Sequence, residues 1–503
     1  MNKKPSVLTS VMWNYASVIV SLLATFFVAP ILVNGLGKSH YGIWSLVLSI
    51  ISYYELMDFG IRTALVRFVA VAESEGDVKE MSEIVSTSFV YFIFVSFLML
   101  VIGIALSFFV DRIFNVSPQD VELARTSLQL VTIFLAIRFP MNALTGALVG
   151  IQRYDVMYST SVLVMIVRSA AICFFVLQGY GLYSVVLVYG SCVVFVMLVN
   201  SLQAFKYVKG LSLSYKLASR SVFRKLRNFG SGVLLLGICK RVTSMSGPFV
   251  VGMVSTMSDV TYFSLAYAFI QYLSAFVTAG ARVLIPRVAS LSGSSLEGKG
   301  GVSDTSFAAL RLTAIGTLLY CGGVFVAGSW FLDIWIGPGT GENVFPVVVY
   351  LLLSAMFSQA AVAIMNLQIG AGNLHCIQYV SVVEALVLVG GGYLLGQEYG
   401  ARGVAMAYVF NSILVQFPGY VYALYRQNGP EFIRKTLKSL GLLVVLAVAV
   451  YLPAWLFVAE RNEALPVIAA TAVSFATFAA LTLLLVLRMK PRDILRLLKR
   501  KAG

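Results

Sequence analysis

The chain has 503 residues, of which 59% are hydrophobic and only 12% are charged, and its mean hydropathy is +0.88. This composition excludes an ordinary soluble domain and indicates a polytopic membrane protein. The formal net charge of +15 does not indicate nucleic-acid binding, because the Lys and Arg residues lie mostly in short connections between apolar stretches.

Apolar stretches of about 20 residues follow one another along the chain, and each is long enough to cross a bilayer as a helix. The sequence therefore predicts an all-α membrane protein with about 14 transmembrane helices. The predicted spans are residues 9–33, 40–61, 86–110, 126–149, 156–178, 181–205, 229–252, 258–281, 306–331, 344–369, 376–396, 401–424, 437–459 and 465–487.

The distribution of basic residues predicts the orientation in the membrane. Most of the 37 Lys and Arg residues fall on connections of one side, with the largest groups at residues 206–227 and 488–501. Because positively charged connections stay in the cytoplasm, we expect a multi-pass protein of the cytoplasmic (inner) membrane with both termini inside. Met1–Ser10 precedes an apolar run without a small-residue cleavage site, so we expect the first helix to be retained.

A short sequence repeat predicts two lobes. Gly60-Ile61-Arg62 followed by Arg67 recurs as Gly280-Ala281-Arg282 followed by Arg287, each time at the end of the second span of a six-span block. Transporters are often built from such parallel repeats, although so short a match also arises by chance. The predicted parts are a first lobe at residues 1–205, a basic cytoplasmic linker at 206–228, a second lobe at 229–425, an appended helix pair at 426–487 and a basic cytoplasmic tail at 488–503.

Four basic residues lie near the middle of predicted spans, where Glu384 is the only comparably deep acid. A lone Arg or Lys at the bilayer centre costs roughly 2.5–3.5 kcal/mol unless water or an anion receives it. We therefore predict a cationic cavity that binds an anionic substrate. Its residues are Arg138, Arg168, Lys240 and Arg241.

Polar residues recur at helical spacing on several predicted spans. This spacing places them on one face of each helix, which we expect to look toward the lumen of the transporter. The alternative is that the hydroxyl groups only bridge neighbouring helices. The set comprises Asn14, Ser17, Ser21 and Thr25 in the first span, Asn142 and Thr145 beside Arg138, and Ser244 beside Lys240.

The second span ends with three charged residues, Glu55, Asp58 and Arg62, spaced to share one helix face, with Asp58 and Arg62 at ion-pairing distance. They predict a gate or a protonatable coupling site, and a plain salt bridge near the membrane interface is the alternative. Arg282 is the counterpart of Arg62 in the second repeat. Glu384 is a further candidate for ion coupling, unless it is a silent protonated carboxyl.

The segments Gly35-Leu36-Gly37, Tyr41-Gly42-Ile43-Trp44-Ser45-Leu46 and Asp58-Phe59-Gly60-Ile61-Arg62, with Arg67, resemble the opening signature of the polysaccharide transporters. These are the Wzx-type lipid-linked oligosaccharide flippases of the multidrug/oligosaccharidyl-lipid/polysaccharide exporter superfamily. The motif covers residues 35–67, of which Asp58 and Arg62 match its end, and the predicted span count and basic central linker extend the likeness along the chain.

The resemblance implies two six-helix lobes around a cationic cavity that binds a polyprenyl (undecaprenyl) diphosphate-linked oligosaccharide. The protein would carry this unit from the cytoplasmic to the outer leaflet by alternating access, for O-antigen, capsule or exopolysaccharide assembly. We expect no cofactor and no metal site. The coupling ion is H⁺ or Na⁺, unless the membrane potential drives transport. We also expect a monomer in contact with membrane lipid and with polysaccharide assembly proteins such as a polymerase and a chain-length regulator.

Three other functions stay open. A peptidoglycan-precursor (lipid II) flippase of the same superfamily would share the cationic cavity, whereas a multidrug or cation antiporter would offer acids to a positive substrate. A membrane-bound glycan polymerase or ligase would present catalytic residues on a large outer loop. The outer connections 111–122 and 333–343 are short and hold neither metal-ligand spacing nor a Ser-His-Asp set, so we expect no enzyme.

Overall fold

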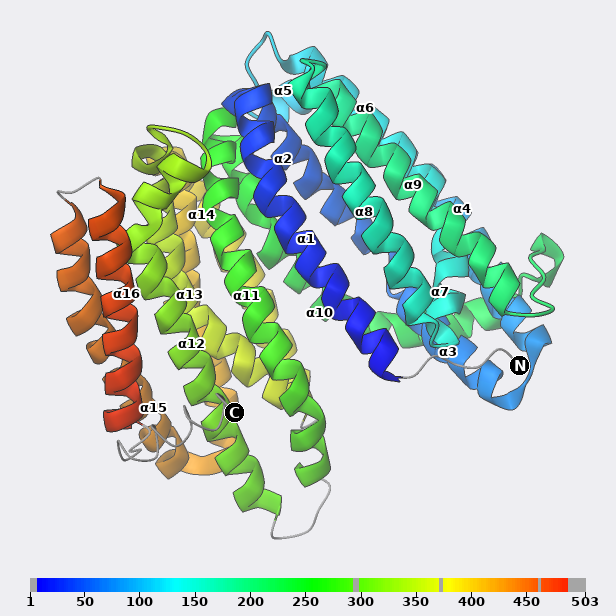
Figure 1. Ribbon diagram of the computed structural model, residues 1–503. Coiled ribbons are helices and arrows are strands. Elements are labelled where there is room, and N and C mark those ends of the chain that lie inside the picture. The colour runs from blue at the N-terminus through cyan, green and yellow to red at the C-terminus, as the bar shows by residue number, and fades with distance from the viewer. Residues whose placement is uncertain (1–6, 293–297, 371–373, 460–462, 487–503) are drawn as a thin grey trace. The chain divides into compact units, whose positions relative to one another are not determined.

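The computed structural model describes residues 7–292, 298–370, 374–459 and 463–486, and within these ranges the chain is helical and contains no β-strand (Figure 1). The predicted fold class, an all-α membrane protein, is confirmed. The chain divides into two compact units, residues 1–261 and 262–503, which are described one at a time.

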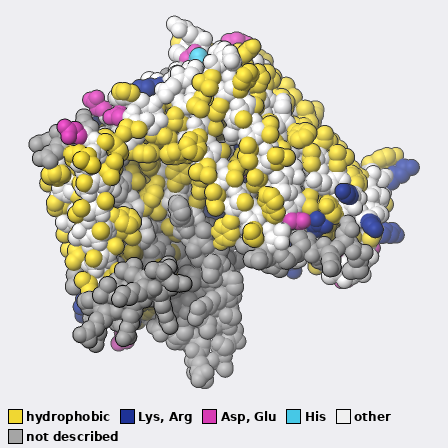
Figure 2. Space-filling view, in the orientation of Figure 1, with side chains coloured by type: hydrophobic (Ala, Val, Ile, Leu, Met, Phe, Trp, Pro, Cys, Tyr) yellow, Lys and Arg dark blue, Asp and Glu magenta, His cyan; other side chains and the backbone are white. Residues whose placement is uncertain are grey.

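Unit 1 is built from helices that run along one another, with α1 against α8, α8 against α9, and α9 against α6 (Figure 1). Hydrophobic side chains cover most of the visible face of these helices, as expected for helices surrounded by lipid (Figure 2). The elements are α1 (Val7–Leu36), α2 (Lys38–Tyr54), η1 (Glu55–Asp58), α3 (Ile61–Glu75), α4 (Val78–Phe108), α5 (Val110–Ile113), α6 (Val121–Arg138), η2 (Phe139–Met141), α7 (Asn142–Gly150), α8 (Tyr154–Leu177), α9 (Gly181–Tyr207), η3 (Tyr215–Leu217) and α10 (Arg220–Val254).

Two of the predicted spans are broken in the structure. The second span bends after η1, where Phe59 and Gly60 adopt left-handed backbone angles (φ 48° and 74°), and the Asp58 carboxylate accepts a hydrogen bond from the Gly60 N–H at 2.7 Å. The prediction that Glu55, Asp58 and Arg62 share the face of one continuous helix is therefore wrong.

The fourth span bends at η2, where Pro140 has no N–H to continue the α-helical pattern. Arg138 ends α6 just before this bend, and Asn142 begins α7 just after it. The halves that follow the two bends, α3 and α7, pack on each other.

The seventh predicted span, α10, packs on α2, α3 and α4. At one end the Asn115 N–H donates to the Gly252 carbonyl at 2.7 Å, and the Thr261 hydroxyl donates to the Lys38 carbonyl at 2.5 Å. Contacts thus place the boundary between compact units after Thr261, whereas the sequence placed it in the linker at 206–228. The two six-helix lobes stay a prediction.

The connection between α9 and α10 is fastened to α4. We call residues 208–219 the strap. Lys209 and Lys216 of the strap are exposed. Figure 2 shows Lys and Arg side chains gathered at one edge of the visible face. Three backbone N–H groups of the strap donate to hydroxyl groups of α4: Ser212 to Ser82 at 3.1 Å, Ser214 to Ser86 at 3.2 Å and Ser219 to Thr87 at 3.0 Å.

Unit 2 contains the longest helices, and glycines bend two of them: α14 at Gly400 (φ 58°) and α15 at Gly429 (φ 81°). The second copy of the repeat lies within α11, which continues through Gly280, so its backbone differs from the bend at Gly60. The elements are α11 (Met257–Ser292, whose first turn belongs to unit 1), α12 (Gly298–Trp335), α13 (Thr340–Gly370), α14 (Leu374–Asn411), η4 (Ser412–Gln416), α15 (Phe417–Ala459), α16 (Ala464–Leu481) and η5 (Thr482–Val486).

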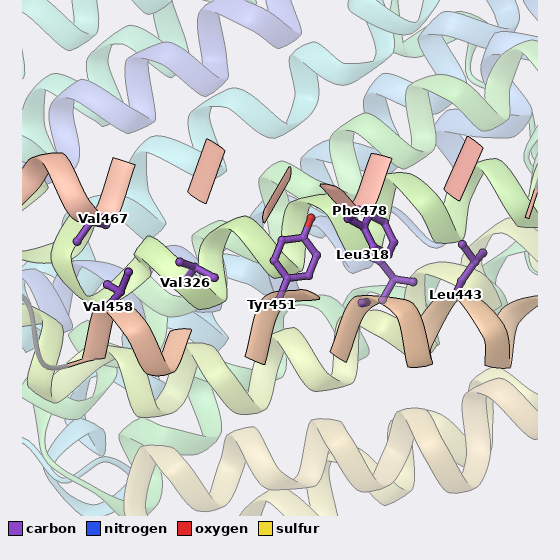
Figure 3. Packing of buried hydrophobic residues seen from close by; sticks show 8 residues of the cluster. Leu318, Val326, Leu443, Tyr451, Val458, Val467 and Phe478 are labelled. Carbon is purple, nitrogen blue, oxygen red and sulfur yellow. The ribbon is translucent and has the colours of Figure 1, made fainter. Parts of the chain in front are cut away.

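A hydrophobic cluster joins the last two predicted spans to α12. Leu318 of α12, Tyr451 of α15 and Phe478 of α16 are buried, and the rings of Tyr451 and Phe478 lie 5.5 Å apart (Figure 3). The helix pair that the sequence treats as appended therefore has a core of its own with α12.

Ten helical segments of the described residues are long and apolar enough to cross a membrane, so the count of fourteen is not confirmed. One of the ten, Ile377–Arg426, has 50 residues and contains the bend at Gly400. At about 1.5 Å per residue such a segment is about two and a half times as long as a bilayer core is thick.

Candidate anion-binding site

The carboxylate of Glu55 holds two arginines of unit 1 at once. Its Oε2 accepts a hydrogen bond from Arg241 Nη2 at 2.8 Å, and its Oε1 accepts one from Arg138 Nη2 at 3.3 Å. The three residues come from η1, α6 and α10, 83 and 186 residues apart along the chain. The site thus brings together η1, the end of α6 and the middle of α10.

Asp58 and Arg62 extend this network. Asp58 lies within electrostatic range of Arg62, Glu55 and Arg241, and Arg62 lies within range of Arg138. The residues that the sequence assigned separately to a gate and to a cationic cavity are therefore part of one cluster.

Arg168 joins the cluster through an aromatic ring that the sequence analysis missed. Its guanidinium lies 5.2 Å from the centre of the Tyr189 ring, and Tyr189 is also within electrostatic range of Arg138 and Glu55. Trp44, which belongs to the signature segment, packs edge-on against Tyr189 at 5.2 Å. The signature thus supports the site through packing, a role that helix spacing alone does not reveal.

We call Glu55, Asp58, Arg62, Arg138, Arg168 and Arg241 the arginine network. Its arginines outnumber its carboxylates two to one, so it keeps an excess of positive charge. The Arg138 side chain is only 12% exposed, and its Nε is buried without a hydrogen-bond partner among the described residues. Such a donor costs about 1–3 kcal/mol until an acceptor reaches it. The arrangement fits an anion with several oxygen atoms.

Lys240, the fourth predicted base, is exposed on α10, and its backbone carbonyl accepts a hydrogen bond from Ser244 at 2.8 Å. Neighbouring helix residues point about 100° apart, so Lys240 and Arg241 do not share a face. The structure brings Arg241, and not Lys240, to Glu55.

Four of the predicted lumen-facing hydroxyl groups bond within their own helices. Those of Ser17, Thr25, Thr145 and Ser244 donate to backbone carbonyls three or four residues earlier, and Asn142 and Thr145 are buried in α7. Asn14 and Ser21 are half-buried and supply the accepting carbonyls for Ser17 and Thr25. Whether these side chains line a transport path stays a prediction.

Two of the predicted coupling candidates, Glu384 and Arg282, lie in unit 2. Glu384 of α14 is buried, with 5% of its surface exposed. Arg282 lies in α11, and its side chain is outside the described part of the structure.

A second polar cluster lies outside the spans, where the α1–α2 turn meets the start of α6. The Asp120 carboxylate accepts hydrogen bonds from Ser39 and Ser117 at 2.8 Å and contacts His40 Nε2 at 3.1 Å. Partial burial raises the pKa of Asp120, but these hydrogen bonds outweigh it, so that its pKa lies below the ordinary value of an aspartate. The cluster fastens two connections together.

Comparison with known proteins identifies the family of this chain. Residues 7–292, more than half of it, match the family model described as "Polysaccharide biosynthesis protein". The chain belongs to this family. It is also 22% identical over 430 residues to a Shigella flexneri protein named "Putative O-antigen transporter", covering 81% of this chain and 96% of the relative.

Solved structures show the same fold at low sequence identity. The lipid II flippase MurJ in an inward closed conformation gives a TM-score of 0.72 at 14% identity, covering 95% of this chain and 98% of MurJ. An inward-facing multidrug resistance MATE family transporter of the MOP superfamily gives 0.66 at 15% identity, covering 82% and 96%. The family match confirms the resemblance to the polysaccharide transporters, and the solved structures that share the fold are a flippase and a transporter, not enzymes.

Proposed function

We propose that this polysaccharide-family transporter carries an undecaprenyl-diphosphate-linked oligosaccharide from the cytoplasmic to the outer leaflet of the cytoplasmic membrane by alternating access. The observation that carries the proposal is the arginine network, in which Glu55 is shared between Arg138 and Arg241. A site with more guanidinium than carboxylate groups, set at helix bends in a membrane protein, suits the diphosphate of a lipid-linked sugar.

In this mechanism the diphosphate binds the arginines in a partly dehydrated site, where charge-assisted hydrogen bonds are strong. The prenyl tail stays in the lipid, because burying it among charged groups would gain nothing over the bilayer. Transport requires that the inward and outward states bind the headgroup with different affinity.

We further propose that H⁺ or Na⁺ supplies this difference, with Glu384 as the candidate coupling group. Both termini lie in the cytoplasm, the transporter works as a monomer, and it hands its cargo to a polymerase and a chain-length regulator. The buried position of Glu384 supports its assignment as the coupling group, and the distribution of Lys and Arg supports the cytoplasmic location of the termini.

The test is reconstitution of the full chain into vesicles that contain undecaprenyl-diphosphate oligosaccharide with a fluorescent label on the sugar. A membrane-impermeant quencher added outside reports the labelled lipid that reaches the outer leaflet. We expect translocation by the wild type, strong loss with Arg241→Ala, and wild-type rates with Arg125→Ala. Arg125 is a matched control, because its partner Glu122 lies outside the arginine network and is largely exposed.

The same vesicles separate the alternative functions. Labelled lipid II moving as fast as the oligosaccharide-linked lipid would support a peptidoglycan-precursor flippase, and exchange of a cationic dye against protons would support a multidrug antiporter. Translocation of none of these lipids by the wild type would overturn the proposal.

A further inference from the structure

Glu55 is the residue that joins Arg138 to Arg241 in the arginine network. Both of its carboxylate oxygens are engaged, one with Arg138 and the other with Arg241. The Glu55 side chain is 38% exposed, whereas that of Arg138 is only 12% exposed. The acid is therefore the accessible partner of the pair.

A carboxylate and a phosphate group present similar oxygen pairs to a guanidinium, and both accept charge-assisted hydrogen bonds. A diphosphate carries more negative charge and more oxygen atoms than one carboxylate. It also offers an acceptor for Arg138 Nε, which has none among the described residues. A diphosphate that reaches the site is thus a stronger partner for these arginines than Glu55.

The backbone at Glu55 suits a side chain that changes partners. Glu55 begins η1, a single turn of four residues that ends in the left-handed pair Phe59 and Gly60. A short turn just before a bend leaves the carboxylate fewer packing constraints than a position within a long helix.

We propose that Glu55 is an exchangeable internal counter-ion, which holds Arg138 and Arg241 in the empty transporter and competes with the diphosphate headgroup for them. This inference rests on the proposed function. Glu55 weakens headgroup binding and promotes release, because the arginines regain a partner when the cargo leaves. Without it, the empty site would hold unpaired guanidinium groups, which are costly when partly buried.

The test measures binding of fluorescent undecaprenyl diphosphate to the full chain in nanodiscs, together with translocation in vesicles. Glu55→Gln keeps the size and hydrogen-bonding ability of the side chain but removes its charge. We expect it to bind roughly tenfold tighter than the wild type, the effect of about 1.4 kcal/mol in competing interaction, and to translocate more slowly over many turnovers. Glu55→Asp keeps the charge but reaches less far, and should bind with an affinity between the two.

The control is Glu122→Gln, which removes one negative charge at the exposed pair with Arg125 and should leave the affinity unchanged. A purely structural role of Glu55 predicts the opposite sign, namely a lower melting temperature together with weaker binding. In the proposed role, the ligand raises the melting temperature of Glu55→Gln by more than that of the wild type.

The outcomes separate this inference from the proposed function. Binding and translocation by the wild type, with equal or weaker binding by Glu55→Gln, overturn the counter-ion role and leave the flippase function standing. Failure of both proteins to bind overturns both. If Glu55→Gln does not fold, Glu55→Asp decides: tighter binding than the wild type supports the role, and equal or weaker binding refutes it.

Discussion

The arginine network of unit 1 and the hydrophobic cluster of unit 2 differ in the kind of side chain that each gathers within the membrane protein. The network gathers charges from η1, α3, α6, α8 and α10 around two carboxylates. The cluster gathers apolar side chains from α12, α15 and α16 along the length of three helices (Figure 3). Charge is concentrated where a ligand can neutralise it, and shape complementarity is used where helices only need to be held together.

The comparison also separates binding from stability. In a bilayer, apolar packing gains little from leaving lipid, so close contact between side chains holds the helices together. Partly buried charges lower stability unless they are paired. Substitutions in the cluster should therefore affect folding, and substitutions in the network should affect transport.

The largest effect is expected from Phe478→Ala in the cluster. Phe478 is fully buried, and its removal leaves a cavity beside Tyr451. The variant should lose about 3–5 kcal/mol of stability, seen as a lower midpoint of denaturation in detergent, while the transport rate per folded molecule stays the same. Phe475→Ala is the control, because Phe475 lies on the same helix and is 46% exposed. A transport defect in folded Phe478→Ala would break the comparison.

Arg138→Ala should have the next largest effect, on transport and not on folding. Loss of one charge-assisted contact to a phosphate costs about 1.5–3 kcal/mol, so translocation should fall roughly tenfold to a hundredfold at limiting substrate. Vesicle translocation measures it, with Arg125→Ala as the matched surface variant. Arg138→Lys should recover only part of the activity, because an ammonium lacks the planar fork. An equal loss in Arg125→Ala would show that charge alone, and not position, matters.

Gly60→Ala tests the bend after η1 and its close contact with α10. Gly60 has a positive φ, and a Cβ there would lie 2.5 Å from the Gly230 carbonyl oxygen of α10. Gly76 has nearly the same φ (73° against 74°) with nothing within 4 Å of an added Cβ, so Gly76→Ala isolates the conformational cost of about 1–2 kcal/mol. Gly60→Ala should be destabilised further and should also transport less, because α10 carries Arg241. Equal melting temperatures for the two variants would contradict this role of the close contact.

The smallest expected effect is at Asp120, and it depends on pH. A carboxylate with a lowered pKa in the folded state stabilises the fold above its unfolded-state pKa, and this contribution is lost as the pH falls through the folded value. Asp120→Asn should therefore have a lower melting temperature than the wild type. The difference corresponds to a loss of about 1 kcal/mol in the free energy of unfolding at pH 7. The difference should persist to about pH 5 and shrink below about pH 4. Asp111→Asn, at an exposed acid of α5, serves as the control, and a difference that grows in acid would refute the assignment.

The all-α membrane fold class could be predicted from the sequence, because long apolar stretches determine it. The sequence alone identifies Glu55, Arg138, Arg168 and Arg241 as candidate site residues. Their mutual arrangement was not predictable, since spacing rules describe one helix, whereas Arg138 and Arg241 reach Glu55 from other elements.

The interruptions of the second and fourth spans were not predicted from the sequence. Pro140 and the Asp58-Phe59-Gly60 sequence are both signals for a break, but a continuous apolar pattern on either side hid them. Lys240 was grouped with Arg241 on sequence proximity, although adjacent helix positions diverge by about 100°. Tyr189 could not be recognised as a site residue from the sequence, because aromatic residues are common in apolar spans.

The strap has a consequence for exchanging parts between relatives. Because its backbone donors are satisfied by Ser82, Ser86 and Thr87, its path is set by α4 and not by the number of residues between α9 and α10. A chimaera that imports this connection without the matching hydroxyl groups would leave amide groups unsatisfied and shift the start of α10. Domain swaps in this family should therefore move α4 and the strap as one cassette.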